Sequence, residues 1–165
     1  MKAVKRIVVV VALATIFTLL AASVAQAAVR IHEGKGVGKA RLGMVDTTAA
    51  KYLGAHQPMQ TDPNYGSRVV YVIYFGKKVG GRWALEMYSN ASHKVFMFTC
   101  NASKYVTAKG VKVGSKESFL KAKYGSALKR SPGTIYTAYT LGKHPFTRFY
   151  VKKSTKRVFQ IIVEK

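Results

Sequence analysis

The sequence predicts an α+β fold of two tandem helix-plus-three-strand repeats, which form one antiparallel sheet with the helices on one face. The first observation is a repeated segment. Residues 41–54 and 112–125 both begin with a basic residue, an aliphatic residue and Gly, continue with an acidic residue, and close on a second Gly 11 positions after the first. The second observation is that three runs rich in Val, Ile, Tyr and Phe follow each copy, which is typical of strands.

Residues 1–27 have the layout of a secretory signal peptide. Lys2, Lys5 and Arg6 precede an apolar run, and Ala25-Gln26-Ala27 fits a cleavage site. An uncleaved membrane anchor is the alternative, although the apolar run is close to the lower limit for a span. We therefore expect a secreted or cell-envelope protein that has no membrane span after cleavage.

In the first half, residues 29–40 are rich in Gly and Lys and are interpreted as a flexible approach to a helix over residues 46–53. Ala49, Ala50 and Leu53 give that helix one apolar face. A loop over residues 56–66 follows, and then strands at 68–76, 82–89 and 94–100. These elements make up the predicted first repeat, residues 28–100.

The second half, residues 101–165, repeats this order. Ser115 is the predicted N-cap of a helix that runs to Tyr124. A loop over residues 129–133 leads to strands at 135–141, 147–153 and 157–163. Because each half would be only marginally stable alone, the two repeats are expected to pack as one globular unit.

This doubled order, with a Gly-bounded helix motif, resembles two related protein families. The motifs are Leu42-Gly43-Met44, Leu53-Gly54, Val113-Gly114-Ser115 and Tyr124-Gly125. The pattern is similar to the β-lactamase-inhibitory-protein fold and to the outer-membrane assembly lipoproteins called BamE (SmpA/OmlA). The resemblance implies a non-catalytic binding module that uses a bare, concave sheet face. The chain lacks the lipoprotein cysteine, and with Cys100 alone it lacks the disulfides of the inhibitor.

The charge of the chain indicates anionic partners. Of 28 Lys and Arg residues, 25 follow residue 27, against six Asp and Glu, which gives residues 28–165 a formal net charge of +19. Outside a cell the candidate partners are an anionic envelope polymer and an acidic protein, and export argues against nucleic acid. The alternative is a solvated basic coat, because the charges are spread along the chain. The sequence leaves the oligomeric state open.

The sequence offers little for catalysis or metal binding. Four His residues have no metal-ligand spacing, and the six acids form no close pair of the kind that glycoside hydrolysis needs. Cys100, the one cysteine, follows an apolar run, which favours a buried thiol, with a disulfide between two chains as the alternative. We expect no catalytic residue, no metal and no cofactor.

Alternation along the predicted strands separates an apolar side from a polar side. Phe149 and Val151, Trp83 with Leu85 and Met87, and Phe159 with Ile161 and Val163 are assigned to the apolar side. The predicted binding face on the other side consists of Tyr74, Tyr88, Tyr136, Arg148, Tyr150 and Lys152. Tyr and Arg are enriched at binding hot spots, while ordinary cross-strand packing is the structural alternative.

Together these observations predict a secreted, strongly basic, non-catalytic binding protein. Its aromatic and basic sheet face would engage an anionic envelope polymer or an acidic protein. The alternatives are an inhibitor of an extracellular or periplasmic enzyme, as the resemblance implies, and a structural protein of the envelope.

Overall fold

The computed structural model describes residues 27–65 and 68–165, and the predicted signal peptide lies almost entirely outside these residues. The described chain is mostly β structure, arranged as a sheet of four strands and a sheet of eight strands with two short α-helices. The predicted fold class, two helix-plus-strand repeats on one sheet, is therefore wrong. Within the described residues, no helix is long and apolar enough to cross a membrane.

The larger sheet has the strand order β4-β5-β6-β7-β12-β11-β10-β9. All neighbouring pairs in it are antiparallel. Its strands are β4 (Gln60–Thr61), β5 (Val70–Val79), β6 (Arg82–Asn90), β7 (Val95–Cys100), β9 (Leu128–Pro132), β10 (Tyr136–Leu141), β11 (Phe146–Lys152) and β12 (Arg157–Glu164). A 3-10 turn, η1 (Pro63–Tyr65), follows β4, and another, η2 (Gly125–Ala127), precedes β9.

The smaller sheet has the order β3-β2-β1-β8, with strands β1 (Val29–His32), β2 (Gly36–Val37), β3 (Ala40–Arg41) and β8 (Tyr105–Thr107). Three of these strands come from the segment interpreted as a flexible lead-in, and that interpretation is wrong. Glycines at positive φ reverse the chain between the strands, with φ of 67° at Gly34 and 58° at Gly38. β1 pairs antiparallel with β2 and parallel with β8.

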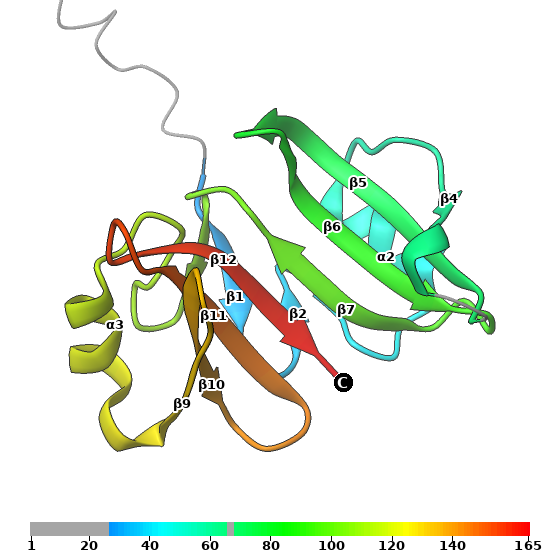
Figure 1. Cartoon of the computed structure of the whole chain (residues 1–165). Helices are drawn as coiled ribbons and strands as arrows, with labels where there is room; N and C mark the ends of the chain where they lie inside the picture. The colour runs from blue at the N-terminus through cyan, green and yellow to red at the C-terminus, as the bar shows by residue number, and fades with distance from the viewer. Residues whose placement is uncertain (1–26, 66–67) are drawn as a thin grey trace, which may run out of the picture.

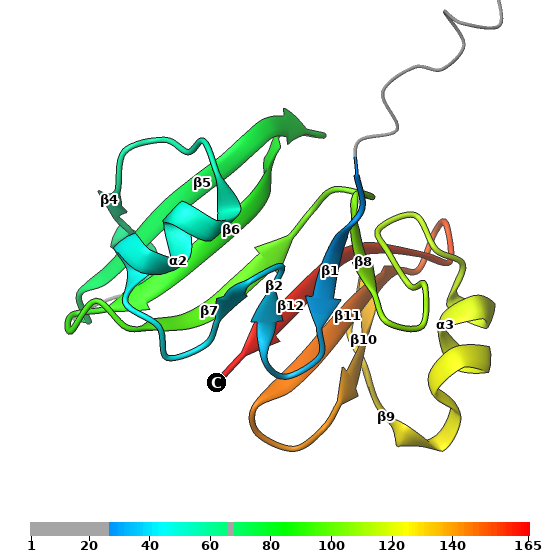
Figure 2. The ribbon, with the colours of Figure 1, turned by 180° about the vertical axis from the view of Figure 1, so that it is seen from behind.

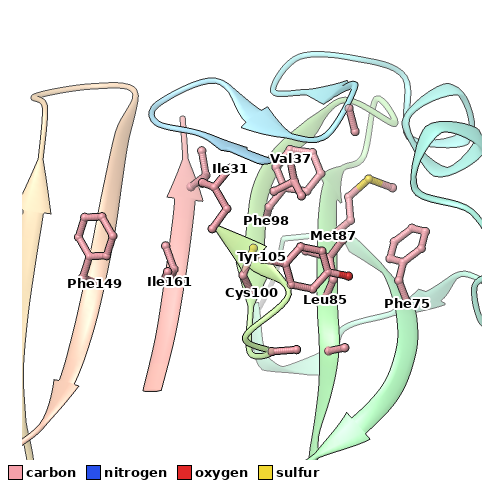
Figure 3. Close-up of a cluster of buried hydrophobic side chains, with 14 of the residues drawn as sticks. Ile31, Val37, Phe75, Leu85, Met87, Phe98, Cys100, Tyr105, Phe149 and Ile161 are labelled. Atoms are coloured by element: carbon pink, nitrogen blue, oxygen red, sulfur yellow. The ribbon is translucent and has the colours of Figure 1, made fainter. Parts of the chain in front are cut away.

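The smaller sheet lies over one face of the larger sheet (Figures 1 and 2). Ile31 and Val37 point from β1 and β2 toward Phe98 on β7 (Figure 3), and all three side chains are fully buried. Burying each such side chain stabilises the fold by about 1.5–3 kcal/mol relative to leaving it in water. We call this covered side the inner face of the larger sheet and the opposite side the outer face.

The two helices have matching starts. α2 (Asp46–Leu53) and α3 (Glu117–Tyr124) both begin on an acidic residue, and their first N–H groups donate to the carbonyl groups of His93 and Lys156 (2.9 and 2.8 Å). Both acceptor residues have positive φ, at 57° and 53°. The sheet thus fixes the start of each helix through one residue of the turn between two strands.

The N-cap prediction for α3 is wrong. Lys116 is the N-cap residue and makes no side-chain cap bond. The Ser115 hydroxyl instead accepts a hydrogen bond from the backbone N–H of Lys112 at 3.0 Å. Helix α3 packs through its own apolar residues, because Leu120 is fully buried and the Tyr124 ring lies 5.5 Å from that of Phe149.

The error in fold class comes from short strands. β2 and β3 have two residues each and β8 has three, so no alternation of apolar and polar residues marks them in the sequence. The predicted loop at 129–133 also pairs with β10, as β9. The division of the chain at residues 100 and 101 stays a prediction, and the pairing of β1 with β8 crosses it.

Candidate binding surface on the outer sheet face

The strand register places the predicted binding residues on the outer face. Residues that pair directly in an antiparallel sheet point to the same side. One transverse row runs across the sheet from Tyr74 through Glu86, Thr99 and Ile162 to Arg148. Tyr74 and Arg148 therefore share a face, although their strands lie on either side of β6, β7 and β12.

The orientation of the other four predicted residues can be inferred from this row. Tyr88 is two positions after Glu86 on β6, while Tyr150 and Lys152 alternate with Arg148 along β11. Tyr136 pairs with Lys152. All six residues lie on the outer face, and their role in binding stays a prediction.

The six residues do not form one cluster. On the first-half strands, the ring of Tyr74 stacks on Trp83 at 5.5 Å with an interplanar angle of 20°. The Lys78 ammonium lies 5.2 Å from the Trp83 ring centre. Trp83 was assigned to the apolar side with Leu85 and Met87, and this assignment is wrong because the ring packs against an outer-face tyrosine.

Tyr88 is held by its neighbours. Its hydroxyl donates to Glu86 Oε2 at 2.7 Å, and its ring packs at 5.9 Å from Tyr65 and 6.5 Å from Phe96. Burial, and then the hydrogen bond to Glu86, raise the pKa of the Tyr88 hydroxyl above its usual value. Tyr88 therefore has a packing role at this surface, and its hydroxyl already donates a hydrogen bond within the protein.

A polar network fills the point where β6 and β12 separate. β7 lies between these strands (Figure 1) and ends at Cys100. The next residue, Asn101, bonds both strands beyond that end. Asn101 Nδ2 donates to the Trp83 carbonyl at 2.9 Å and to Glu86 Oε1 at 3.2 Å. Asn101 Oδ1 accepts a hydrogen bond from Gln160 Nε2 at 3.1 Å. The buried amide of Asn101 therefore joins the two strands after β7 has ended.

Glu86 is the acid of this network. Burial raises the pKa of its carboxyl, against hydrogen bonds from Tyr88 and Asn101 and the nearby charge of Arg82, which lower it. Both of its carboxylate oxygens accept hydrogen bonds from the protein, so Glu86 is assigned a structural role in this network.

A second aromatic group lies on the second-half strands. The rings of Tyr136 and Tyr150 meet edge to face at 5.1 Å and 80°, and the ring of Phe159 lies 6.2 Å from each. Phe159 was assigned to the apolar side, which is wrong. Tyr150 pairs with Gln160 and the next residue, Val151, pairs with Val158, so Phe159 is the extra residue of a β-bulge. The bulge turns its ring to the outer face.

This aromatic group borders a hollow of about 350 Å³, named here the Phe159 hollow. It is lined by Arg82, Ile135, Tyr136, Lys152 and Phe159. The Arg82 guanidinium lies 5.5 Å from the Phe159 ring centre, and Ile135 is 72% exposed. The hollow thus combines an apolar wall with two cations, at the fork between the two halves of the sheet.

A second hollow of about 350 Å³ adjoins the first at Tyr136, and we name it the Arg148 hollow. It is lined by Ser131, Pro132, Gly133, Tyr136, Ala138, Thr140, Arg148 and Tyr150. Arg148 is fixed in place: Nε and Nη1 donate to Thr140 Oγ1 and Tyr150 Oη, both at 3.3 Å, and the guanidinium lies 4.5 Å from the ring centre of Phe146. Among the described residues, neither lining contains an Asp or Glu.

In the part of the chain that the structure describes, almost all Lys and Arg side chains lack a carboxylate partner. Over residues 27–65 and 68–165, Lys121 is the one Lys or Arg within ion-pair distance of an acid, Glu117 at 2.9 Å. The other Lys and Arg side chains of these two ranges leave their positive charge for external anions. On the outer face, Arg82, Arg148 and Lys152 contribute to this field.

Two further groups of reactive side chains are structural. Asp46 Oδ2 accepts the Ser89 hydroxyl at 2.7 Å and lies 2.9 Å from His93 Nδ1. Because Ser89 and His93 both contact the acid, His93 is not placed to activate the Ser89 hydroxyl. Cys100 is a free, fully buried thiol whose pKa is raised by burial. No group of three His, Cys, Asp or Glu residues suited to a metal ion occurs in the described chain.

Sequence reasoning missed four contributors to this surface: Arg82, Ile135, Phe159 and Asn101. Arg82 is the first residue of β6 and Ile135 directly precedes β10, and alternation does not fix the direction of side chains at such positions. No signal in the sequence marks the bulge that turns Phe159 outward. Asn101 carries a weak signal, because a polar residue directly after an apolar strand suits a place where pairing ends.

Comparisons with known proteins support the fold alone. No protein-family model matches the chain, and a search of curated proteins finds no match. Among solved structures, the chain is similar to the crystal structure of the uncharacterized protein YfeY from Escherichia coli, with a TM-score of 0.56 and 18% sequence identity. The match covers 84% of this chain and 99% of that one. At this identity the likeness shows the architecture alone.

Proposed function

We propose that this protein is a non-catalytic binding protein of the cell envelope that, after export, engages an anionic envelope polymer through the outer face of its larger sheet. The observation that carries the proposal is the pair of adjoining hollows on that face. Both are bordered by aromatic rings and arginine, and neither lining includes a carboxylate. Such a surface attracts anions and repels cations.

A polymer fits this surface better than an acidic protein does. A stable protein interface generally has an apolar core inside a polar rim. Among the described residues, the exposed large apolar side chains are dispersed and only Ile135 and Tyr136 lie beside the hollows, whereas exposed basic side chains occur along both halves of the chain. A flexible polyanion gains from many dispersed cations because each contact releases bound counterions.

The test is binding of residues 28–165 to polygalacturonate, a polyanion of sugar units, measured by calorimetry from about 50 to 500 mM salt. We expect the affinity to fall steeply as salt rises. The double variant Arg82→Gln/Lys152→Gln should lose about tenfold in affinity, equivalent to about 1.4 kcal/mol. The matched control is Lys51→Gln/Lys123→Gln, which removes the same charge from exposed positions on α2 and α3.

Equal losses of affinity in the two double variants would show that binding depends on the total charge and not on its position. That result would overturn the assignment to the outer face. An absence of binding to the polymer would overturn the proposal. Affinity for an acidic protein that survives high salt but is lost in Tyr88→Ala and Tyr150→Ala would favour that partner instead.

A further inference from the structure

The two hollows on the outer face are joined. They share Tyr136, and the edge-to-face pair of Tyr136 and Tyr150 stands at their boundary. Each hollow also has an arginine of its own, Arg82 in the Phe159 hollow and Arg148 in the Arg148 hollow. The same combination of ring and cation therefore occurs twice, side by side, which is the arrangement expected for a ligand with a repeating unit.

Both arginines are held against aromatic rings. The guanidinium of Arg82 lies 5.5 Å from the centre of the Phe159 ring, and that of Arg148 lies 4.5 Å from the centre of the Phe146 ring. Arg148 also uses Nε and Nη1 on Thr140 and Tyr150. A guanidinium that is already oriented loses less side-chain entropy when it binds a carboxylate, so each hollow offers a preorganised anion contact.

The walls of the hollows indicate what carries the anion. In the Phe159 hollow the rings of Phe159 and Tyr136 and the exposed Ile135 make an apolar wall next to the cations. A bare phosphate would lie against this wall without an apolar surface to bury. A sugar ring has an apolar C–H face that packs on aromatic rings. A volume of about 350 Å³ is at the lower end of the range for small-molecule sites and suits one ring-sized unit.

We propose that the two hollows are adjoining subsites for two successive acidic sugar units of a polysaccharide, with the Tyr136–Tyr150 pair between them. In each subsite the ring of the sugar packs on the aromatic wall and its carboxylate binds the local arginine. Lys152 adds a second cation in the Phe159 hollow. This inference rests on the proposed function and gives it a ligand class and a minimum length of two units.

The experiment compares galacturonic acid, its dimer and its trimer as ligands for residues 28–165 at one salt concentration, by calorimetry. Linking two units makes the second contact intramolecular, so the dimer should bind about tenfold or more tightly than the monomer. The trimer should gain no more than about threefold over the dimer, since its third unit lies beyond the two subsites.

Two single variants test whether both subsites are used. Arg82→Gln and Arg148→Gln should each bring the affinity for the dimer down to about that for the monomer, whereas Lys51→Gln should change it less than about twofold. Tyr136→Ala should weaken dimer binding about tenfold, because this residue borders both hollows. Tyr136 is 36% exposed, and an unchanged unfolding midpoint would confirm that its variant is folded.

A short linear polyphosphate, which has charge but no rings, is the contrasting ligand. It should bind more weakly than the sugar dimer, and Tyr136→Ala should leave its affinity unchanged. The inference is overturned if polyphosphate matches the dimer, or if the dimer binds within about twofold of the monomer. If the dimer binds no better than the monomer while polygalacturonate still binds in a salt-dependent manner, the proposed function stands without the subsites. If polygalacturonate itself does not bind, both the proposed function and the two subsites are overturned.

Discussion

Replacement of Asn101 by Ala should destabilise the protein strongly. Asn101 is 4% exposed and makes three hydrogen bonds, to the Trp83 carbonyl, the Glu86 carboxyl and the Gln160 amide. The two neutral bonds contribute about 1 kcal/mol each and the bond to the carboxyl about 1.5–3 kcal/mol. Glu86 and Gln160 are only partly buried, so water can replace part of the lost bonding. This lowers the expected loss of unfolding free energy to about 3 kcal/mol.

The loss is measured by urea denaturation, followed by the fluorescence of Trp83, the single tryptophan, and independently by circular dichroism. A loss of about 3 kcal/mol corresponds to a fall of about 10 °C in the melting temperature for a chain of this size. The matched control is Asn64→Ala on the exposed turn, whose side chain bonds only Asp62 and should cost less than about 0.5 kcal/mol. A loss below about 1 kcal/mol for Asn101→Ala would refute the idea that this side chain joins β6 to β12.

Three further predictions concern buried polar groups and the thiol. The raised pKa of Glu86 means that its stabilising contribution is complete below the pKa of the unfolded chain and is lost as pH rises through the folded pKa. Glu86→Gln should therefore make the unfolding free energy less dependent on pH above the usual pKa of a glutamate, and an unchanged profile would contradict the assignment. Ser89→Ala removes one donor from the fully buried Asp46 and should cost about 1.5–3 kcal/mol in urea denaturation, whereas an effect under about 0.5 kcal/mol would show that Asp46 does not need it. Cys100 should resist a thiol reagent at pH 8 in the native protein and react only as the chain unfolds, so fast labelling of the folded protein would show that the thiol is accessible.

The sequence predicts the long elements well and the short ones poorly. Helix α2 spans Asp46–Leu53, the predicted range, because an acid at its start and Gly at its end are local signals. The strands of the smaller sheet have no such signals. Ile31 and Val37 are buried because distant parts of the chain cover them, and glycine-rich turns conceal the pairing. Without these strands the sequence indicated one sheet covered by helices, in place of two sheets.

The candidate surface shows the same limit at the level of single residues. Alternation gives the direction of Tyr74, Arg148 and Tyr150 because their strands are regular where they lie. The direction of Phe159 depends on one extra residue in β12, which reverses the alternation at that point. The network around Asn101 depends on where β7 ends relative to its neighbours, which is a tertiary property.

The parallel pair formed by β1 and β8 affects the order in which the molecule is completed. β1 starts at Val29, and its partner residues begin at Tyr105, so most of the first half and all of β7 lie between them in the chain. Because synthesis begins at the N-terminus, β1 has one unpaired edge until β8 has emerged. An unpaired edge strand is open to pairing with other chains, so the incomplete protein is exposed to aggregation during this interval.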